Sequence, residues 1–146
     1  GAAGTLGTAI SAAIEREGGT AIRSDLAGRA GMDVALDVTR EEDWQRVAVW
    51  FGESHGRLDG LVNNAAIFST IRMAPFWEIT EEEWDAIMDV NIKGVWLLTS
   101  ALIELLKASG GASIVNIGSD SVVLGRTDYL HYVASKSAVT GMSYSM

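Results

Sequence analysis

Tyr132 and Lys136 are the two side chains whose types and spacing most clearly suggest chemistry. They lie four positions apart, which places a phenol and an ammonium on one face of a helix. Neither group is a good base near neutral pH, because a free tyrosine has a pKa of about 10 and a free lysine of about 10.4. A nearby cation favours the phenolate, so the pair could accept and donate a proton. Such pairs also arise by chance as plain surface neighbours.

A glycine-rich segment at the start of the chain has the composition of a phosphate-binding turn. Gly1, Gly4 and Gly7 precede an amphipathic stretch that runs to residues 18–19. Glycines let the backbone approach a pyrophosphate closely, and the dipole of a helix N-terminus favours negative charge there. The segment alone does not distinguish a phosphate site from an ordinary loop.

Asp25 bears on the choice of a nucleotide. It ends the next predicted strand, eighteen residues after Gly7. An acidic residue at about this distance accepts hydrogen bonds from the adenosine ribose hydroxyls and would repel a 2′-phosphate, which favours NAD over NADP. Arg23 and Arg29 lie close enough to keep NADP open, and a simple turn residue is the alternative interpretation of Asp25.

The elements that must position these residues alternate between strands and helices. Short apolar runs predict strands at 20–24, 32–36, 58–63 and 112–117. Helical periodicity predicts helices after the glycine turn, at 39–51, at 80–106 as one helix or two, and from 128 onward. Thr39 with Glu42, and Thr80 with Glu83, have the spacing of capping boxes. The alternation predicts an α/β fold, a Rossmann-like doubly wound parallel sheet with helices on both faces in three α/β/α layers.

The whole chain, residues 1–146, is expected to be one nucleotide-binding domain that is truncated at both ends. A doubly wound fold needs a strand before its glycine turn, and nothing precedes Gly1. The last predicted helix has no stop signal, which leaves the C-terminal substrate region outside this chain. Residues 25–32 are also short for a complete crossover helix.

Composition excludes several classes of protein and of site. The net charge of −8 argues against nucleic acid and anionic membrane partners, which require clustered basic side chains. The absence of cysteine rules out disulfides and thiolate metal sites, and no other metal-ligand pattern is present, so no metal is expected. No apolar run reaches the roughly 20 residues of a membrane span. These features favour a cytoplasmic protein.

Five motifs in order resemble those of the classical short-chain dehydrogenase/reductase family. Ser119 precedes Tyr132 by thirteen residues, the usual spacing of the catalytic serine and tyrosine in that family. The motifs are Asp37-Val38, Leu61-Val62-Asn63-Asn64-Ala65-Ala66, Asn91-Ile92-Lys93-Gly94, Ile114-Val115-Asn116-Ile117-Gly118-Ser119 and Tyr132-x-x-x-Lys136.

The resemblance implies a role for each residue of the catalytic set. Tyr132 would be the general acid/base, and Ser119 would hydrogen-bond to the same substrate oxygen. Lys136 would favour the tyrosine phenolate and hold the nicotinamide ribose, and Asn91 would help carry a proton-relay water. The expected cofactor-binding residues are Gly1, Gly4, Thr5, Leu6, Gly7, Asp25, Asp37, Val38, Asn64, Ala65, Ala66, Tyr132 and Lys136.

The resemblance also implies an activity and an assembly. The expected function is hydride transfer between NAD(H) and a small-molecule secondary alcohol or ketone. An NADP(H)-dependent carbonyl reductase of the same family and a non-catalytic dinucleotide-binding sensor or scaffold are the alternatives. Family members usually pair their long helices, here residues 82–107 and the helix from Tyr132, so a homodimer or homotetramer is expected.

Two motifs depart from the family pattern, the glycine turn and the Asn-Asn-Ala-Gly motif. Thr5 stands where the central glycine of the turn is expected, and Gly4 is one residue early. Ala66 replaces the last glycine of the Asn-Asn-Ala-Gly motif. The segment from Phe68 to Trp77 follows a strand at the expected cofactor edge, so part of it is predicted to line the substrate pocket.

Overall fold

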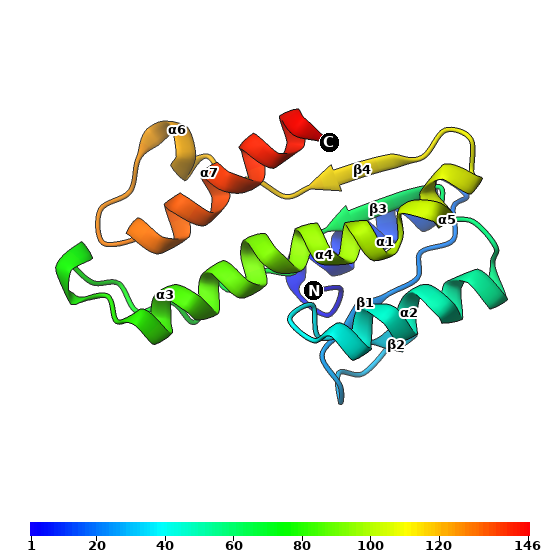
Figure 1. The fold of residues 1–146 in the computed structure, drawn as a ribbon, viewed down its shortest axis with the longest axis horizontal. Helices are drawn as coiled ribbons and strands as arrows, with labels where there is room; N and C mark the ends of the chain where they lie inside the picture. Colours follow the sequence, from blue (N-terminus) through cyan, green and yellow to red (C-terminus); the bar gives the residue numbers. More distant parts are fainter.

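The computed structural model describes residues 1–146, and strands and helices alternate along it (Figure 1). The strands are β1 (Ser24–Asp25), β2 (Val34–Ala35), β3 (Gly60–Asn63) and β4 (Ser113–Asn116). The helices are α1 (Thr5–Arg16), α2 (Glu41–Ser54), α3 (Glu81–Met88), α4 (Gly94–Ala101), α5 (Ile103–Ala108), α6 (Ser121–Leu124) and α7 (Leu130–Ser145). A 3-10 turn spans Phe76–Glu78, and a π-helical turn spans Asp89–Lys93.

The sheet consists of two parallel pairs separated by a cavity. β1 pairs with β2, and β3 pairs with β4. A cavity of about 730 Å³ is lined by residues flanking or within β1 on one side and by β3 on the other. It lies where doubly wound folds place the strand that leads into the glycine turn. Of the strand predicted at 20–24, only Ser24 lies in β1, which pairs with β2, and residues 20–22 line the cavity.

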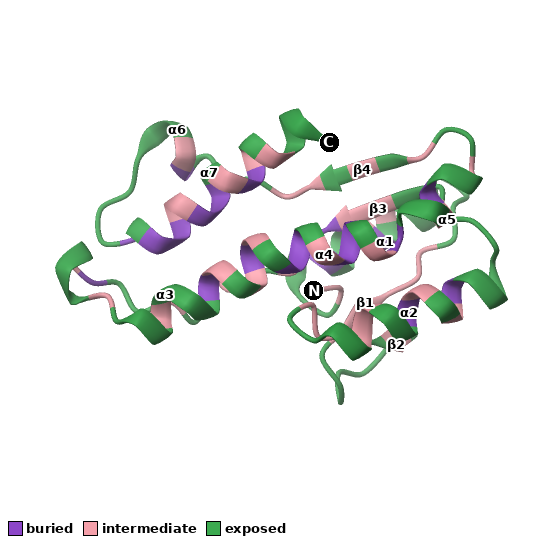
Figure 2. Ribbon diagram, viewed as in Figure 1, coloured by how far each residue is buried: buried purple, intermediate pink, exposed green.

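Helices lie on both faces of the strands, as the fold class predicts. In Figure 1, α1 lies behind the strands, whereas α2 and the run from α3 to α5 lie in front. The main core forms on the front side, and its buried side chains are Leu36, Val47, Phe51, Leu98, Leu102 and Leu106. Figure 2 shows the buried positions of α2, α4 and α7 as stripes along each helix. This core packs α2, α4 and α5 together, whereas α7 contacts the π-helical turn, α3, α6 and β4.

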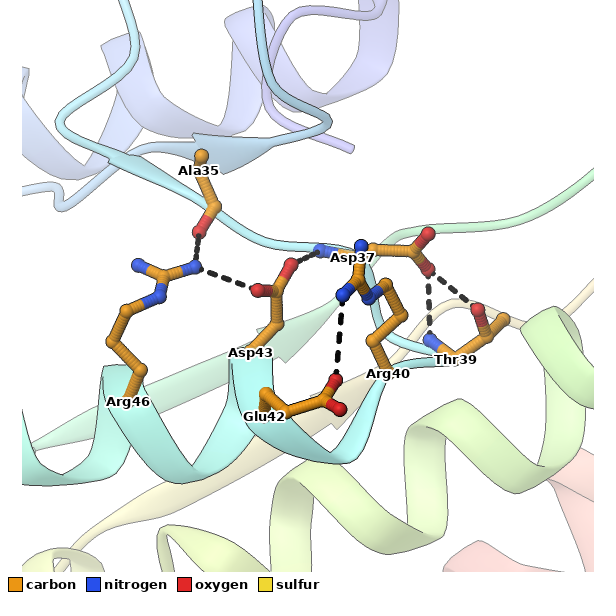
Figure 3. Close-up of polar contacts among 7 residues, drawn as sticks. All are labelled: Ala35, Asp37, Thr39, Arg40, Glu42, Asp43 and Arg46. Carbon is orange, nitrogen blue, oxygen red and sulfur yellow. Dashed lines mark hydrogen bonds and ion pairs between the residues drawn. The ribbon is translucent and has the colours of Figure 1, made fainter.

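One of the two predicted capping boxes is confirmed and the other is wrong. Thr80 accepts a hydrogen bond from the Glu83 N–H, and the Glu83 carboxylate accepts one from the Thr80 N–H. At α2, the N-cap is Arg40, and no side chain caps the helix. Thr39 instead donates its N–H and its hydroxyl to Asp37 Oδ1, at 2.9 and 2.7 Å (Figure 3). The Thr39 hydroxyl is therefore engaged in a local turn with Asp37 and does not cap α2.

The predicted long helix at 80–106 is a continuous rod in Figure 1 but is not regular. The π-helical turn separates α3 from α4, and Leu102 separates α4 from α5. Single π-helical turns inside α-helices occur frequently at functional sites. Between β1 and β2 the chain forms turns and no crossover helix, as its length predicts. None of the helices has both the length and the apolarity that crossing a membrane requires.

Candidate active site

The four predicted catalytic residues come from three elements near the carboxyl ends of β3 and β4. Ser119 follows β4, Asn91 lies in the π-helical turn, and Tyr132 and Lys136 lie in α7. The parallel pairing of β3 with β4 brings the ends of both strands to one edge. Ligands of open α/β sheets bind outside this edge. The predicted residues therefore lie at the edge where the fold places a ligand.

Tyr132 and Lys136 adopt the side-by-side arrangement that their spacing predicts. The Lys136 ammonium nitrogen lies 6.0 Å from the centroid of the Tyr132 ring. Lys136 is 4% exposed, and its Nζ donates to the Ile117 carbonyl oxygen at 2.7 Å. Burial lowers the pKa of the Lys136 ammonium. The Tyr132 ring packs against Phe68 at a centroid distance of 4.9 Å, whereas the Tyr132 hydroxyl forms no hydrogen bond within the chain.

Ser119 is held by a second serine that the sequence did not single out as a partner. The two hydroxyl oxygens of Ser119 and Ser121 are 2.8 Å apart, and the Ser121 N–H donates to Ser119 Oγ at 3.2 Å. Ser121 is buried as the first residue of α6. These two contacts fix the position of the Ser119 oxygen. No hydrogen bond joins Ser119 to Tyr132.

Asn91 is almost fully buried, and all of its side-chain hydrogen-bonding groups have partners. Its Oδ1 accepts from the Ile67 N–H at 2.8 Å, and its Nδ2 donates to Ser135 Oγ at 3.0 Å and to the Ile67 carbonyl at 3.3 Å. Ser135 is inaccessible to solvent and donates to the Tyr132 carbonyl at 2.8 Å. Asn91 therefore joins the segment after β3 to the helix of Tyr132, and it makes no direct hydrogen bond with Lys136.

The glycine turn leads into α1 as the sequence predicts, and its glycines are not equivalent. A Cβ on Gly7 would lie 2.2 Å from the Gly1 carbonyl oxygen, so position 7 requires glycine. At Gly4, the N-cap of α1, a Cβ would meet only ordinary contacts. The N–H groups of Thr5, Leu6 and Gly7 have no acceptor within the chain. Thr5 thus offers its N–H in the first helical turn although it replaces a glycine.

Asn64 and Asp25 both support the glycine turn. Asn64 Nδ2 donates to the Gly1 carbonyl at 2.8 Å, and the backbone of Ala65 leaves no room for a side chain at Gly1. Asp25 accepts from the Ala3 N–H at 2.9 Å and from the Leu26 N–H at 2.8 Å. Burial acts to raise the pKa of Asp25, but these hydrogen bonds outweigh it, and its pKa lies below the ordinary value.

The remaining predicted cofactor residues lie after β2 and β3. The Asp37 N–H donates to Asp43 Oδ2 at 2.8 Å, which ties the end of β2 to α2 (Figure 3). Val38 packs against the first residue of α4, where a Cβ on Gly94 would lie 2.8 Å from Val38 Cγ2. Ala66 is exposed just beyond β3. These positions line the same edge as the glycine turn.

A buried polar network that the sequence analysis missed joins the strand ends to two helices. Asn63 Nδ2 donates to Thr99 Oγ1 at 3.1 Å and to Asn116 Oδ1 at 2.8 Å. Asn116 Nδ2 in turn donates to Ser143 Oγ at 2.9 Å. The sequence contains one signal for this network, which is Asn116 within the apolar run 114–117. Because buried polar groups are normally hydrogen-bonded, an asparagine in a buried strand indicates polar partners nearby. The network connects β3 and β4 to α4 and α7.

Comparisons with known proteins agree with this arrangement. The family model described as short chain dehydrogenase matches residues 1–146. The chain is 32% identical to the 3-oxoacyl-[acyl-carrier-protein] reductase FabG of Thermotoga maritima, covering 98% of this chain and 63% of that protein. It is 31% identical to the D-threitol dehydrogenase of Mycolicibacterium smegmatis, covering 98% of this chain and 59% of that protein. The chain therefore spans about three fifths of the length of these relatives.

Solved structures share the fold. A short-chain dehydrogenase from Streptomyces avermitilis superposes with a TM-score of 0.87 at 30% identity, over 99% of this chain and 56% of that one. A gluconate 5-dehydrogenase from Burkholderia cenocepacia, in complex with NADP and tartrate, has a TM-score of 0.87 at 27% identity, over 100% of this chain and 62% of that one. With a family model that matches every residue and relatives that carry the same fold, the chain belongs to the short-chain dehydrogenase family.

Proposed function

We propose that the protein is an NAD(H)-dependent oxidoreductase that transfers a hydride between the cofactor and a secondary alcohol or ketone. The observation that carries this proposal is the Tyr132 ring, whose hydroxyl forms no hydrogen bond within the chain and whose centroid lies 6.0 Å from the buried ammonium of Lys136. Relatives named as reductases and dehydrogenases agree with the same class of reaction. The proposal concerns the whole protein, of which the chain carries the candidate catalytic set.

The residues at the glycine turn suit a dinucleotide. Three N–H groups without acceptors, from Thr5, Leu6 and Gly7, point out of the first turn of α1, where the helix dipole favours a pyrophosphate. Asp25 lies beside this turn and has acceptor capacity left for ribose hydroxyls, because each carboxylate oxygen accepts more than one hydrogen bond. Gly1 belongs to the same proposed cofactor-binding surface.

The side chains then have distinct tasks. When bound, the nicotinamide supplies the hydride chemistry. In alcohol oxidation Tyr132 takes the proton of the substrate hydroxyl, and in ketone reduction it returns a proton to the carbonyl oxygen. Ser119 hydrogen-bonds to that same oxygen and orients it. Lys136 stabilises negative charge on the Tyr132 oxygen and binds the nicotinamide ribose, and Asn91 helps hold a water through which Lys136 exchanges protons.

Replacing Tyr132 with phenylalanine tests this assignment. General acid/base catalysis contributes roughly 10²- to 10⁴-fold, so Y132F should lose at least that much of kcat in a screen of alcohols and sugars with NAD. Binding of NADH, followed by its fluorescence, should stay within twofold. The matched control is Tyr144→Phe, because Tyr144 is an exposed tyrosine of the same helix. Undiminished turnover by Y132F would refute the mechanism, and cofactor binding without any turnover would favour a sensor or scaffold.

The choice of NAD rests on Asp25. An ionised carboxylate beside the ribose repels a 2′-phosphate, so we expect NAD to bind more tightly than NADP by roughly tenfold or more. Of the two arginines that favour NADP, Arg23 forms an ion pair with Glu15, whereas Arg29 has no carboxylate partner. NADP is therefore the second candidate. Titration of the protein with each nucleotide separates the two candidates by their dissociation constants, and tighter binding of NADP would overturn the assignment of NAD.

We also propose that the protein assembles as a homodimer or homotetramer through its long helices. Three large apolar side chains stay more than a third exposed along α3, α4 and α5, namely Trp84, Trp96 and Ile103, and exposed apolar patches mark interaction sites. Sedimentation equilibrium should give a mass of two or four chains. A monomer at micromolar concentration would contradict this proposal.

A further inference from the structure

Arg126 is an unpaired cation beside the proposed catalytic tyrosine. It lies in the loop between α6 and α7, with its guanidinium carbon 4.2 Å from the centroid of the Tyr129 ring. Tyr129 is buried, and its ring centroid is 6.4 Å from that of Tyr132. The distance from the guanidinium carbon to the centroid of the Tyr132 ring is therefore at most the sum of these two distances.

The lack of an ion pair at Arg126 is unusual within this chain. Eight of the eleven basic side chains form an ion pair, in a chain that also carries nineteen acidic ones. The three exceptions are Lys136, Arg29 and Arg126. We have placed Lys136 beside the Tyr132 oxygen and the nicotinamide ribose, and Arg29 follows Asp25 at the adenosine end. Arg126 is the remaining one, and it lies in the loop between Ser119 and the helix of Tyr132.

The loop that carries Arg126 is held in a defined conformation. Asp128 has a φ of 63°, and it is the only non-glycine residue of the chain with a positive φ. Residues in this region cost about 1–3 kcal/mol and cluster at functional sites. The Asp128 carbonyl accepts a hydrogen bond from the Ala74 N–H at 3.2 Å, which ties the loop to the segment after β3. Arg126 is thus presented from a fixed backbone.

The surroundings of Arg126 suit a small organic anion. The guanidinium carbon lies over the Tyr129 ring, and Arg126 donates no hydrogen bond within the chain, so its N–H groups are available for a bidentate carboxylate. Phe68 is 45% exposed and packs against the Tyr132 ring, so it provides an apolar wall beside that ring. A short carbon chain could lie along this wall with its charged end at Arg126.

We propose that Arg126 binds a carboxylate of the substrate, so that the protein acts on hydroxy acids and keto acids. The inference rests on the proposed function, because it takes the reacting alcohol or carbonyl group to lie at Ser119 and Tyr132. It names a substrate class and a specificity-determining residue for that reaction.

The test compares a hydroxy acid that the protein oxidises with the methyl ester of the same acid. Losing a charge-assisted hydrogen bond typically weakens binding by roughly 10- to 100-fold. Arg126→Gln should raise KM for the acid by that factor and leave KM for the ester within twofold, and Arg126→Lys should fall between. The matched control is Arg57→Gln, since Arg57 lies before β3 and pairs with Asp59 at 3.3 Å. Equal effects of R126Q on acid and ester would overturn the proposal.

A binding experiment separates this inference from the proposed reaction. Malonate serves as an unreactive probe and is titrated calorimetrically into the protein with NAD present, at 0.15 M salt. Wild type and R57Q should bind it at least tenfold more tightly than R126Q. If no compound is turned over but this difference is observed, the proposed function fails and the anion site stands. If malonate binds equally to wild type and R126Q, or to neither, the anion site is refuted.

Discussion

Replacing Gly94 with alanine tests how closely α4 approaches the end of β2. Gly94 has helical backbone angles, φ −59° and ψ −39°, so alanine suits its conformation. A Cβ there would lie 3.0 Å from Val38 Cβ and 3.1 Å from the Val38 carbonyl oxygen. Neither atom can move away by a side-chain rotation. Overpacking costs about 1–3 kcal/mol, and the helical preference of alanine returns about 0.5–1 kcal/mol.

The expected net loss is therefore about 1 kcal/mol in the free energy of unfolding, or roughly 2–4 °C in Tm. The matched control is Gly141→Ala in α7, where a Cβ would meet nothing within 4 Å. That variant should gain about 0.5–1 kcal/mol. Urea unfolding followed by circular dichroism measures both. If G94A is at least as stable as wild type while G141A gains the expected amount, the close packing of α4 on Val38 is refuted.

Two further predictions concern hydrogen bonds that hold the site. Asn63→Leu leaves Thr99 Oγ1 and Asn116 Oδ1 without their donor and should cost about 1–3 kcal/mol in urea unfolding, so a loss below 0.5 kcal/mol would argue against the network. The hydrogen bond from Arg72 is the main cause that lowers the pKa of Glu83 from 4.5 to about 2. The stabilisation from this ionised carboxylate is present above pH 4.5 and is lost as the pH falls towards 2. The stability difference between wild type and E83Q should therefore shrink over that interval, and a constant difference would contradict this reasoning.

Features that depend on local sequence were predicted well. The turn at Gly1 to Gly7, the helix that follows it and the cap at Thr80 are confirmed, because each depends on residues within a few positions of one another. The cap at Thr39 was predicted wrongly although its spacing matched. Asp37 lies two residues before Thr39 and accepts both of its donors, so an equally local interaction prevailed.

Features that depend on distant contacts could not be predicted. The strand expected at 20–24 is mostly absent, because a strand is defined by pairing with a neighbour and β2 pairs only with Ser24–Asp25. The bond between Asn91 and Ser135 joins positions 44 residues apart, and only the packing of α7 on the π-helical turn creates it. Spacing placed Tyr132 next to Lys136 on one helix, but it contained no information on which buried partners hold that helix.

Those partners explain how residues from separate elements can form one site. Ser119, Asn91 and Tyr132 lie on a loop, a π-helical turn and a helix, and catalysis tolerates displacements of well under 1 Å between such groups. Apolar contacts are non-directional and would let α7 slide along the sheet. Hydrogen bonds are directional, and those of Ser135 and Ser143 hold α7 at two points that are about two turns apart. These polar groups therefore fix the position of Tyr132 relative to the strand ends.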